Sequence, residues 1–282
     1  MELMKKKKII LFSPNGYVGS FIKKELEREK NAQLFTMTRD SYPEQFPLHC
    51  DILIYSAAIT SARYETSEKY VQDNVVTAVS IVNFCKSHNI SRIIYLSTDE
   101  IYGELNVNKV TDRAVMVNPN LYAITKYLAE KIIMQSGISY YILRLPGIVG
   151  QVWGNNFIHR LMDKIKNNDQ IELYNMDREF NNIIHIEDLT KFIIKLCNRE
   201  DMKENEVFLL GNTENVLLRD VVVYMKKLYC STCVINNIDT NLKRYFTLDV
   251  TKAVEYGYSS KNIKIIIKEL YSIQKGVNFE YE

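Results

Sequence analysis

The sequence has few of the features that mark fibrous, membrane-spanning or nucleic-acid-binding chains. It holds only 5 prolines, 10 glycines and 5 cysteines among 282 residues, and its net charge is +2. No apolar run approaches the roughly 18 residues that a membrane-spanning helix needs. A nearly balanced charge lacks the strongly basic face that is typical of nucleic-acid binding. We therefore expect a cytoplasmic chain with no membrane span and no nucleic-acid partner.

The few cysteines and histidines do not form a metal or disulfide pattern. Cys230 and Cys233 have the spacing of redox motifs, but they follow a helix-like stretch and do not open one, where a thiolate would be stabilised. No second pair completes a zinc site, so we expect reduced thiols and no metal. His185 has no partner at ligand spacing and is expected to satisfy a backbone group before a helix near Glu187. The basic run Lys5–Lys8 precedes only four apolar residues, too few for a signal peptide.

Short β-branched runs alternate with longer helical patterns along most of the chain. Near-continuous apolar runs are typical of parallel strands that are covered on both faces. The predicted strands are Ile9–Phe12, Leu34–Thr38, Ile52–Ser56, Ile93–Ser97, Tyr140–Leu145 and Val207–Leu210. The predicted helices between them are Val18–Lys30, Ser67–His88 and Tyr122–Ser136, of which the last two stop at Asn89 and Gly137. The alternation predicts an α/β fold with a Rossmann-type doubly wound parallel sheet and a small C-terminal α/β region.

The first predicted strand leads directly into a glycine-containing turn and then into a helix. Gly16 would let the backbone approach a pyrophosphate, and Gly19 would let the helix and strand pack closely. The helix N-terminus offers free N–H groups and a positive dipole end to an anion. Ser13 stands where this pattern usually has its first glycine, and an ordinary strand-to-helix turn is the alternative. The predicted cofactor-binding residues of the turn are Ser13, Asn15, Gly16, Tyr17, Val18 and Gly19.

The second predicted strand ends in Thr38 and Arg39, where a carboxylate would mark an NAD enzyme. A guanidinium at this position can pair with a 2′-phosphate. We therefore expect NADP(H) to be favoured as cofactor, with NAD(H) possible. A solvent-exposed arginine without this role is the alternative.

A threonine, a tyrosine and a lysine form the candidate reactive set. Thr98 follows the fourth predicted strand, and Tyr122 and Lys126 lie four positions apart on one face of a predicted helix. A lysine ammonium near a tyrosine lowers the pKa of the phenol, which then exchanges a proton near neutral pH. Thr98 can hydrogen-bond the same reacting oxygen. Such a set suits the interconversion of an alcohol and a ketone beside a nicotinamide.

These motifs, in this order, resemble those of the extended short-chain dehydrogenase/reductase family, the NAD-dependent epimerase/dehydratases that modify sugar nucleotides. The resemblance rests on Ser13–Gly19, Ile54–Ala58, Asn74–Val75, Ser97–Gly103, Tyr122–Lys126, Arg144–Gly150 and Ile184–Asp188. It implies that Tyr122 is the acid/base, that Lys126 holds the nicotinamide ribose and that Thr98 orients the substrate oxygen. It also implies cofactor contacts from Ala57, Ala58 and Pro146, and contacts to a nucleotide-sugar substrate from Asn156, Phe157 and Asn182.

The resemblance also implies a domain organisation and an assembly. Residues 1–150 with 183–212 would form the NAD(P)-binding domain, and residues 151–182 with 213–282 the smaller substrate-binding region. Members of the family are often dimers that join through two helices at one edge of the sheet. Those helices would be Ser67–His88 and Tyr122–Ser136 here, so we expect a homodimer.

Two departures from the family pattern stand out. The stretch from Arg39 to Asp51 is short, so the third strand–helix unit, which normally helps to hold adenine, is predicted to be missing or vestigial. Asn181 and Asn182 stand where many relatives carry Arg-Asp, and that arginine often contacts the substrate diphosphate.

Three reactions and one non-catalytic role remain open. Thr98, Asp99 and Glu100 resemble the triplet of sugar-nucleotide 4,6-dehydratases, in which two carboxyl groups divide acid and base work. Alternatively, Asp99 caps the following turn and Glu100 bonds only to backbone. The short chain and Arg39 favour a 4-keto-6-deoxy-sugar reductase or an epimerase over a dehydratase. The non-enzyme alternative is a sensor that binds NADP(H) on the same fold.

Overall fold

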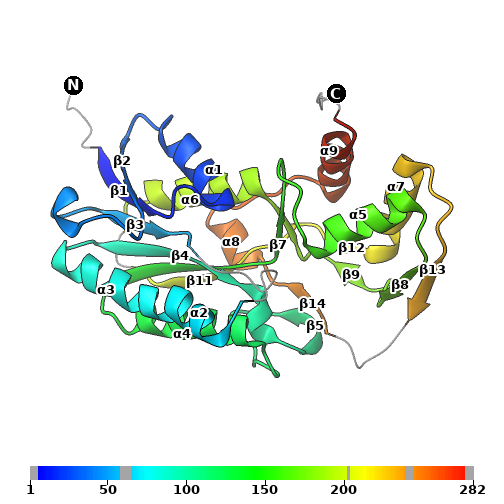
Figure 1. The fold of residues 1–282 in the computed structure, drawn as a ribbon, viewed down its shortest axis with the longest axis horizontal. Coiled ribbons are helices and arrows are strands. Elements are labelled where there is room, and N and C mark those ends of the chain that lie inside the picture. The colour runs from blue at the N-terminus through cyan, green and yellow to red at the C-terminus, as the bar shows by residue number, and fades with distance from the viewer. Residues whose placement is uncertain (1–5, 58–64, 202–203, 239–243, 277–282) are drawn as a thin grey trace. The chain divides into compact units, whose positions relative to one another are not determined.

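The computed structural model describes residues 6–57, 65–201, 204–238 and 244–276 (Figure 1). Contacts divide the chain into two compact units, each with its own apolar core. Unit 1 comprises Met1–Ile101, Pro119–Arg144 and Leu189–Phe208, and unit 2 comprises Tyr102–Asn118, Leu145–Asp188 and Leu209–Glu282. In the part of the chain that the structure describes, no helix is both long and apolar enough to cross a membrane.

Unit 1 is built on a six-stranded sheet with the strand order β11-β6-β4-β3-β1-β2. Its strands are β1 (Lys7–Phe12), β2 (Ala32–Met37), β3 (Ile52–Tyr55), β4 (Arg92–Thr98), β6 (Ser139–Leu145) and β11 (Glu206–Leu209). Strand β1 pairs in parallel with β2 and β3, and β3 pairs in parallel with β4. Each of the six predicted apolar runs forms one of these strands, because a strand buried on both faces needs apolar side chains throughout. The predicted α/β fold is confirmed.

Helices cover both faces of this sheet (Figure 1). One face carries α1 (Tyr17–Leu26) and α6 (Ile186–Asn198). The other carries α2 (Ser67–Tyr70), the π-helical turn η3 (Val71–Val76), α3 (Thr77–Ser87) and α4 (Leu121–Met134). Helix α1 ends before the predicted Lys30, since Glu27–Asn31 offers no apolar side chain for the sheet. The predicted stops Asn89 and Gly137 have left-handed φ angles of 50° and 80°, as expected for residues that follow helices.

Strand β2 is the edge of the sheet, next to β1. The chain returns from β2 to β3 through a single short helical turn, η1 (Pro43–Gln45). Among the described residues no strand lies beyond β2, which confirms that the third strand–helix unit is missing. The side of the sheet that would hold adenine in relatives is therefore built from fewer residues here.

Unit 2 is a small α/β region that consists of four strand pairs and several helices. The pairs are β7 (Gly147–Val149) with β10 (Ile183–His185), β8 (Ile171–Tyr174) with β13 (Ile235–Ile238), β5 (Asn106–Val110) with β14 (Tyr245–Leu248), and β9 (Glu179–Phe180) with β12 (Val216–Leu217). The first three pairs are parallel and the fourth is antiparallel. Its helices are α5 (Phe157–Asn167), α7 (Leu218–Tyr229), α8 (Thr251–Glu255) and α9 (Ile263–Lys275). Helices α5, α7 and α9 pack around one apolar core.

Candidate active site

The turn between β1 and α1 has the geometry that a dinucleotide-binding turn requires. Ser13 adopts a left-handed φ of 68°, which explains why glycine is the usual residue at this position. A Cβ atom on Gly19 would lie 2.0 Å from the Ser13 carbonyl oxygen, so only glycine lets α1 approach β1 as predicted. A Cβ on Gly16 would meet only ordinary contacts, the nearest at 3.6 Å from Ser13 Oγ. The space above Gly16 is therefore not needed for packing and fits the close approach of a pyrophosphate.

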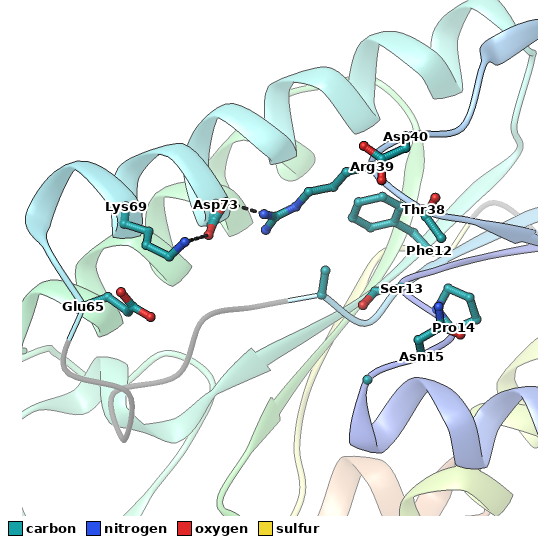
Figure 2. A pocket seen from close by; sticks show the side chains of 12 residues that line it. Phe12, Ser13, Pro14, Asn15, Thr38, Arg39, Asp40, Glu65, Lys69 and Asp73 are labelled. Carbon is teal, nitrogen blue, oxygen red and sulfur yellow. Dashed lines mark ion pairs between the residues drawn. The ribbon is translucent and has the colours of Figure 1, made fainter.

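A cavity of about 470 Å³ lies beside this turn, at the carboxyl ends of β1, β2 and β3 (Figure 2). Six predicted cofactor residues line it, namely Ser13, Asn15, Gly16, Thr38, Arg39 and Ala57. Phe12, Pro14, Asp40, Glu65, Lys69 and Asp73 complete the lining and were not predicted from the sequence. Tyr17, Val18 and Gly19 belong to the first turn of α1 and do not line the cavity. The predicted residue Ala58 lies outside the described residues.

Arg39 does not stand alone at the edge of the cavity. Its Nη1 atom lies 2.6 Å from Oδ1 of Asp73, and the Lys69 ammonium lies 3.9 Å from Oδ2 of the same carboxylate (Figure 2). The Asp73 side chain is only 8% exposed, whereas that of Arg39 is 51% exposed. Arg39 is therefore solvent-exposed, as one of the two sequence interpretations expects, but it is also paired with a buried carboxylate. The sequence offered no signal for the pairing, because Asp73 belongs to a distant helical segment.

Tyr122 is buried at the start of α4, and Thr98 lies at the end of β4. The Tyr70 ring lies 6.2 Å from that of Tyr122. Burial raises the pKa of the Tyr122 phenol and the nearby carboxylates of Glu100 and Asp99 raise it further, whereas the polar side chain of Thr98 acts to lower it. The phenol is therefore held in its protonated form.

Lys126 lies one turn further along α4 and is 1% exposed. Its Nζ donates to the Leu96 carbonyl at 2.6 Å and lies 4.2 Å from the centre of the Tyr95 ring. Burial lowers the pKa of Lys126 from 10.5 to about 7, and the Glu130 carboxylate opposes this shift. The expectation that Lys126 lowers the pKa of Tyr122 is wrong for this geometry, because burial of the phenol dominates and the ammonium is bonded to the Leu96 carbonyl.

Asp99 and Glu100 belong to a short helical turn, η4 (Asp99–Tyr102), that follows β4. Thr98 Oγ1 accepts a hydrogen bond from the Glu100 backbone N–H at 3.2 Å, so the threonine side chain caps the start of this turn. The Glu100 carboxylate accepts the side-chain amide of Asn120 at 2.9 Å, and Asn120 also caps α4 by accepting the Ala123 N–H at 2.8 Å. The alternative in which Glu100 bonds only to backbone is therefore wrong.

A buried ion pair joins α4 to the sheet, one helical turn after Lys126. Arg144 on β6 donates from Nε and Nη2 to the two carboxylate oxygens of Glu130, at 3.1 and 2.8 Å. Ser97 on β4 donates to the same carboxylate. Two parallel charge-assisted bonds fix both the position and the rotation of the carboxylate. The helix that carries Tyr122 is thus held by side chains from two strands.

Apart from Thr98, the predicted substrate-binding residues belong to unit 2. Asn156 caps α5 through the His159 N–H at 3.0 Å and donates to the Ile148 carbonyl at 2.8 Å. Phe157 is 39% exposed and its ring lies 6.1 Å from that of Phe180. Asn182, the third of these residues, is half-buried. Pro146, which was predicted to contact the cofactor, is buried between β6 and β7. Their proposed contacts with ligands stay predictions.

Asn181 and His185, two polar residues considered in the sequence analysis, form hydrogen bonds and an ion pair within unit 2. Asn181 is 1% exposed, accepts the Leu248 N–H at 2.8 Å and donates to the Leu248 carbonyl at 2.9 Å. His185 accepts the Glu187 N–H at 3.3 Å, as predicted, and its Nε2 lies 3.2 Å from the Glu269 carboxylate. Across the described ranges no group of three or more histidine, cysteine, aspartate or glutamate side chains could hold a metal ion.

Residues 14–211, more than half of the chain, match the NAD dependent epimerase/dehydratase family. The chain belongs to this family. The match confirms the resemblance to the NAD-dependent epimerase/dehydratases. The cofactor turn, the Thr98–Tyr122 pair and the six-stranded sheet described above all lie within the matched residues or, for β1 and Ser13, directly before them.

Proteins similar to this chain are named for several different reactions. A dTDP-D-glucose 4,6-dehydratase from Dictyostelium discoideum is 25% identical over 161 residues, which cover 49% of this chain and 36% of the relative. The chain thus spans about a third of the length of such curated relatives. The fold matches that of the UDP-glucuronic acid 4-epimerase from Bacillus cereus in complex with UDP-glucuronic acid and NAD, with a TM-score of 0.77, 17% identity and coverage of 95% and 99% of the two chains. It also matches RMD from Pseudomonas aeruginosa complexed with NADPH, with a TM-score of 0.76, 15% identity and coverage of 96% and 100%.

Proposed function

We propose that this enzyme reduces a nucleotide-activated 4-keto-6-deoxy sugar, with epimerisation of a sugar nucleotide as the related possibility. The observation that carries the proposal is the buried Tyr122 at the start of α4, which lies near Thr98 at the end of β4 and one helical turn before the buried Lys126. Both residues belong to the unit that also contains the dinucleotide turn and its cavity. This is the arrangement that chemistry at a carbonyl beside a nicotinamide needs.

The residues around the turn fit a nicotinamide dinucleotide. The space above Gly16 and the N-terminus of α1 would receive the pyrophosphate, since free N–H groups and the helix dipole favour an anion there. Thr38 and Arg39 would contact the adenosine ribose, and Lys126 the nicotinamide ribose. Bound NAD(P)(H) supplies or accepts the hydride. We propose a small preference for NADP(H) over NAD(H), because Arg39 lies at the end of β2 and lines the cavity but is paired with Asp73.

Tyr122 would act as a general acid in the reductive direction. The raised pKa keeps its phenol protonated at neutral pH, and a protonated phenol is the form that donates a proton to a carbonyl oxygen. Thr98, which lies near the phenol, would hydrogen-bond the same oxygen and orient it. An oxidative first step would need the phenolate, which the burial of Tyr122 and the two neighbouring carboxylates disfavour. These features support reduction over reactions that begin by removing a hydroxyl proton.

A 4,6-dehydratase is the second candidate function. Asp99 and Glu100 both act electrostatically on Tyr122, so two carboxyl groups lie near the phenol. Asn120 holds the Glu100 carboxylate in place. Paired carboxyl groups of this kind could remove water from the sugar after its oxidation.

We also propose that the enzyme is a homodimer and works in the cytoplasm. Helical segments α2–η3–α3 and α4 are neighbours on one face of unit 1 (Figure 1). Their exposed sides carry large apolar residues, namely Val71, Val76, Val79, Leu121, Ile124 and Leu128, which are 38–48% exposed. Apolar side chains gathered on neighbouring helices are typical of an association surface.

Two measurements test the proposed function. NADPH or NADH should raise the midpoint of thermal unfolding, because a ligand that binds only the folded state stabilises it. With a 4-keto sugar nucleotide and NADPH, Tyr122→Phe should lower turnover by about 100-fold or more without changing the nucleotide-induced shift. The matched control is Tyr127→Phe, on the same helix, which should retain wild-type turnover. Equal turnover of Tyr122→Phe and wild type would refute the assigned role.

A further inference from the structure

The cavity beside the dinucleotide turn contains an unusual balance of charges. Its lining includes two cations, Arg39 and Lys69, and three carboxylates, Asp40, Glu65 and Asp73 (Figure 2). Both cations pair with the same carboxylate, since Arg39 lies 2.6 Å and Lys69 3.9 Å from Asp73. The positive charge that a 2′-phosphate would need is therefore already matched within the protein.

Asp73 is held in this position by the helix that carries it. It lies in the π-helical turn η3, where the next residue, Asn74, is also buried. Asn74 donates to Thr125 Oγ1 on α4 at 3.0 Å, and Thr125 in turn donates to the Tyr122 carbonyl at 2.8 Å. A π-turn inserts one extra residue into a helix, and such turns are frequent at functional sites. Moving Asp73 away from the cavity would break the contact of its neighbour with α4.

The Arg39 side chain, in contrast, is half exposed and attached to the segment after β2. It can leave Asp73 only by giving up a short charge-assisted bond to a buried carboxylate. A ligand phosphate must therefore compete with Asp73 for the guanidinium. A ribose that carries only a 2′-hydroxyl does not enter this competition.

We propose that Asp73 is a specificity-determining residue, which holds Arg39 and Lys69 in ion pairs and so keeps the affinity for NADP(H) close to that for NAD(H). The inference rests on the proposed function, because it requires a nicotinamide dinucleotide in the cavity. The preference for NADP(H) that Arg39 confers is smaller in this enzyme than it would be without Asp73. Neutralising Asp73 releases both cations for the 2′-phosphate.

The test is equilibrium binding of NADPH and NADH to the full chain, measured by calorimetry or by nucleotide fluorescence. Asp73→Asn preserves the shape of the side chain and removes its charge. We expect its Kd for NADPH to fall roughly tenfold, the size of one charge-assisted hydrogen bond, while the Kd for NADH changes by less than about threefold. The thermal unfolding midpoint of the variant, measured alongside, verifies that it is folded.

Asp40→Asn is the matched control, because it removes the same charge from the same cavity lining. In the described part of the chain no ion pair joins Asp40 to Arg39, so this control should leave the ratio of the two Kd values nearly unchanged. Arg39→Met should weaken NADPH binding by less than about threefold in the wild-type background and by about tenfold in the Asp73→Asn background. This double-mutant comparison remains informative through Arg39→Met alone if Asp73→Asn is poorly folded.

Three results would overturn the inference. Asp73→Asn could change both Kd values equally, Asp40→Asn could produce the same gain as Asp73→Asn, or Arg39→Met could weaken NADPH binding strongly while Asp73 is intact. A failure of the proposed function looks different. Neither nucleotide would then bind to the folded wild type or to any variant, which would overturn both proposals together.

Discussion

Lys126 places its ammonium group in the interior of unit 1, and this placement has a consequence for stability. Burial lowers its pKa from 10.5 to about 7. The folded state therefore binds fewer protons than the unfolded state between these two values, so the contribution of Lys126 to the free energy of unfolding rises with pH across that window. Below pH 7 both states are protonated, and the full cost of the buried cation remains.

We expect Lys126→Met to remove this dependence. The difference in free energy of unfolding between wild type and the variant should shift in favour of wild type by about 2–3 kcal/mol from near pH 6 to near pH 9. Urea unfolding at several pH values measures it. Lys131→Met, at an exposed position of the same helix, is the control and should show no such trend. A difference that does not vary with pH would mean that Lys126 keeps its charge in the folded protein.

Ser13 is a second residue whose local state is unfavourable. Its left-handed φ of 68° costs a non-glycine residue about 1–2 kcal/mol. We expect Ser13→Gly to raise the free energy of unfolding by up to about 1 kcal/mol, because relief of strain exceeds the added chain entropy. Ser13→Val should lower it by about 2 kcal/mol, since a β-branched residue tolerates this region poorly. Chemical denaturation of the three proteins checks the order, and equal stability of the glycine and valine variants would contradict it.

At the scale of the elements, the N-terminus of α4 connects helix capping with the candidate chemistry. Asn120 caps α4 with its side-chain oxygen and holds Glu100 with its amide. We expect Asn120→Ala to lower the free energy of unfolding by about 1 kcal/mol through loss of the cap. Asn120→Asp should keep the cap but place a carboxylate beside Glu100 and remove its donor.

The two substitutions at Asn120 separate stability from catalysis. If Glu100 takes part in the reaction, both variants should reduce turnover, whereas only Asn120→Ala should reduce the stability of α4 by the full amount. Turnover at saturating substrate and the thermal midpoint give the two values. Wild-type turnover in both variants would assign Glu100 a purely structural role.

Some elements of the structure could be predicted from the sequence and others could not. All six strands of the main sheet were predictable, because a strand covered on both faces must be apolar throughout. The π-helical turn η3 was not predictable from the sequence, because its extra residue leaves the spacing of apolar residues in the surrounding helix nearly unchanged. The Arg39–Asp73 pair was missed for a related reason: it joins an edge strand to a helix that follows much later in the chain. The sequence identified Lys126 as a candidate site residue. The bond from its ammonium group to the Leu96 carbonyl could not be predicted, because it depends on how the helix packs on the sheet.

At the scale of the whole molecule, the exposed apolar residues of unit 1 lead to a prediction about assembly. Ile124 and Leu128 are 48% and 46% exposed and lie one turn apart on α4. Val76 and Val79, 42% and 43% exposed, lie on the neighbouring η3–α3 segment. In a dimer with two-fold symmetry the same patch is used by both copies, so every substitution acts twice.

The double variant Ile124→Glu/Leu128→Glu would therefore place four carboxylates in one interface. We expect wild type to have the mass of a dimer in light scattering at micromolar concentration, and the double variant to have that of a monomer. Val254→Glu replaces an equally exposed valine on α8 of unit 2, and this control should stay dimeric. A monomeric wild type would show that these helices do not join two copies. A double variant that remains dimeric would place the interface elsewhere, because four buried like charges would cost far more than a dimer of this kind could tolerate.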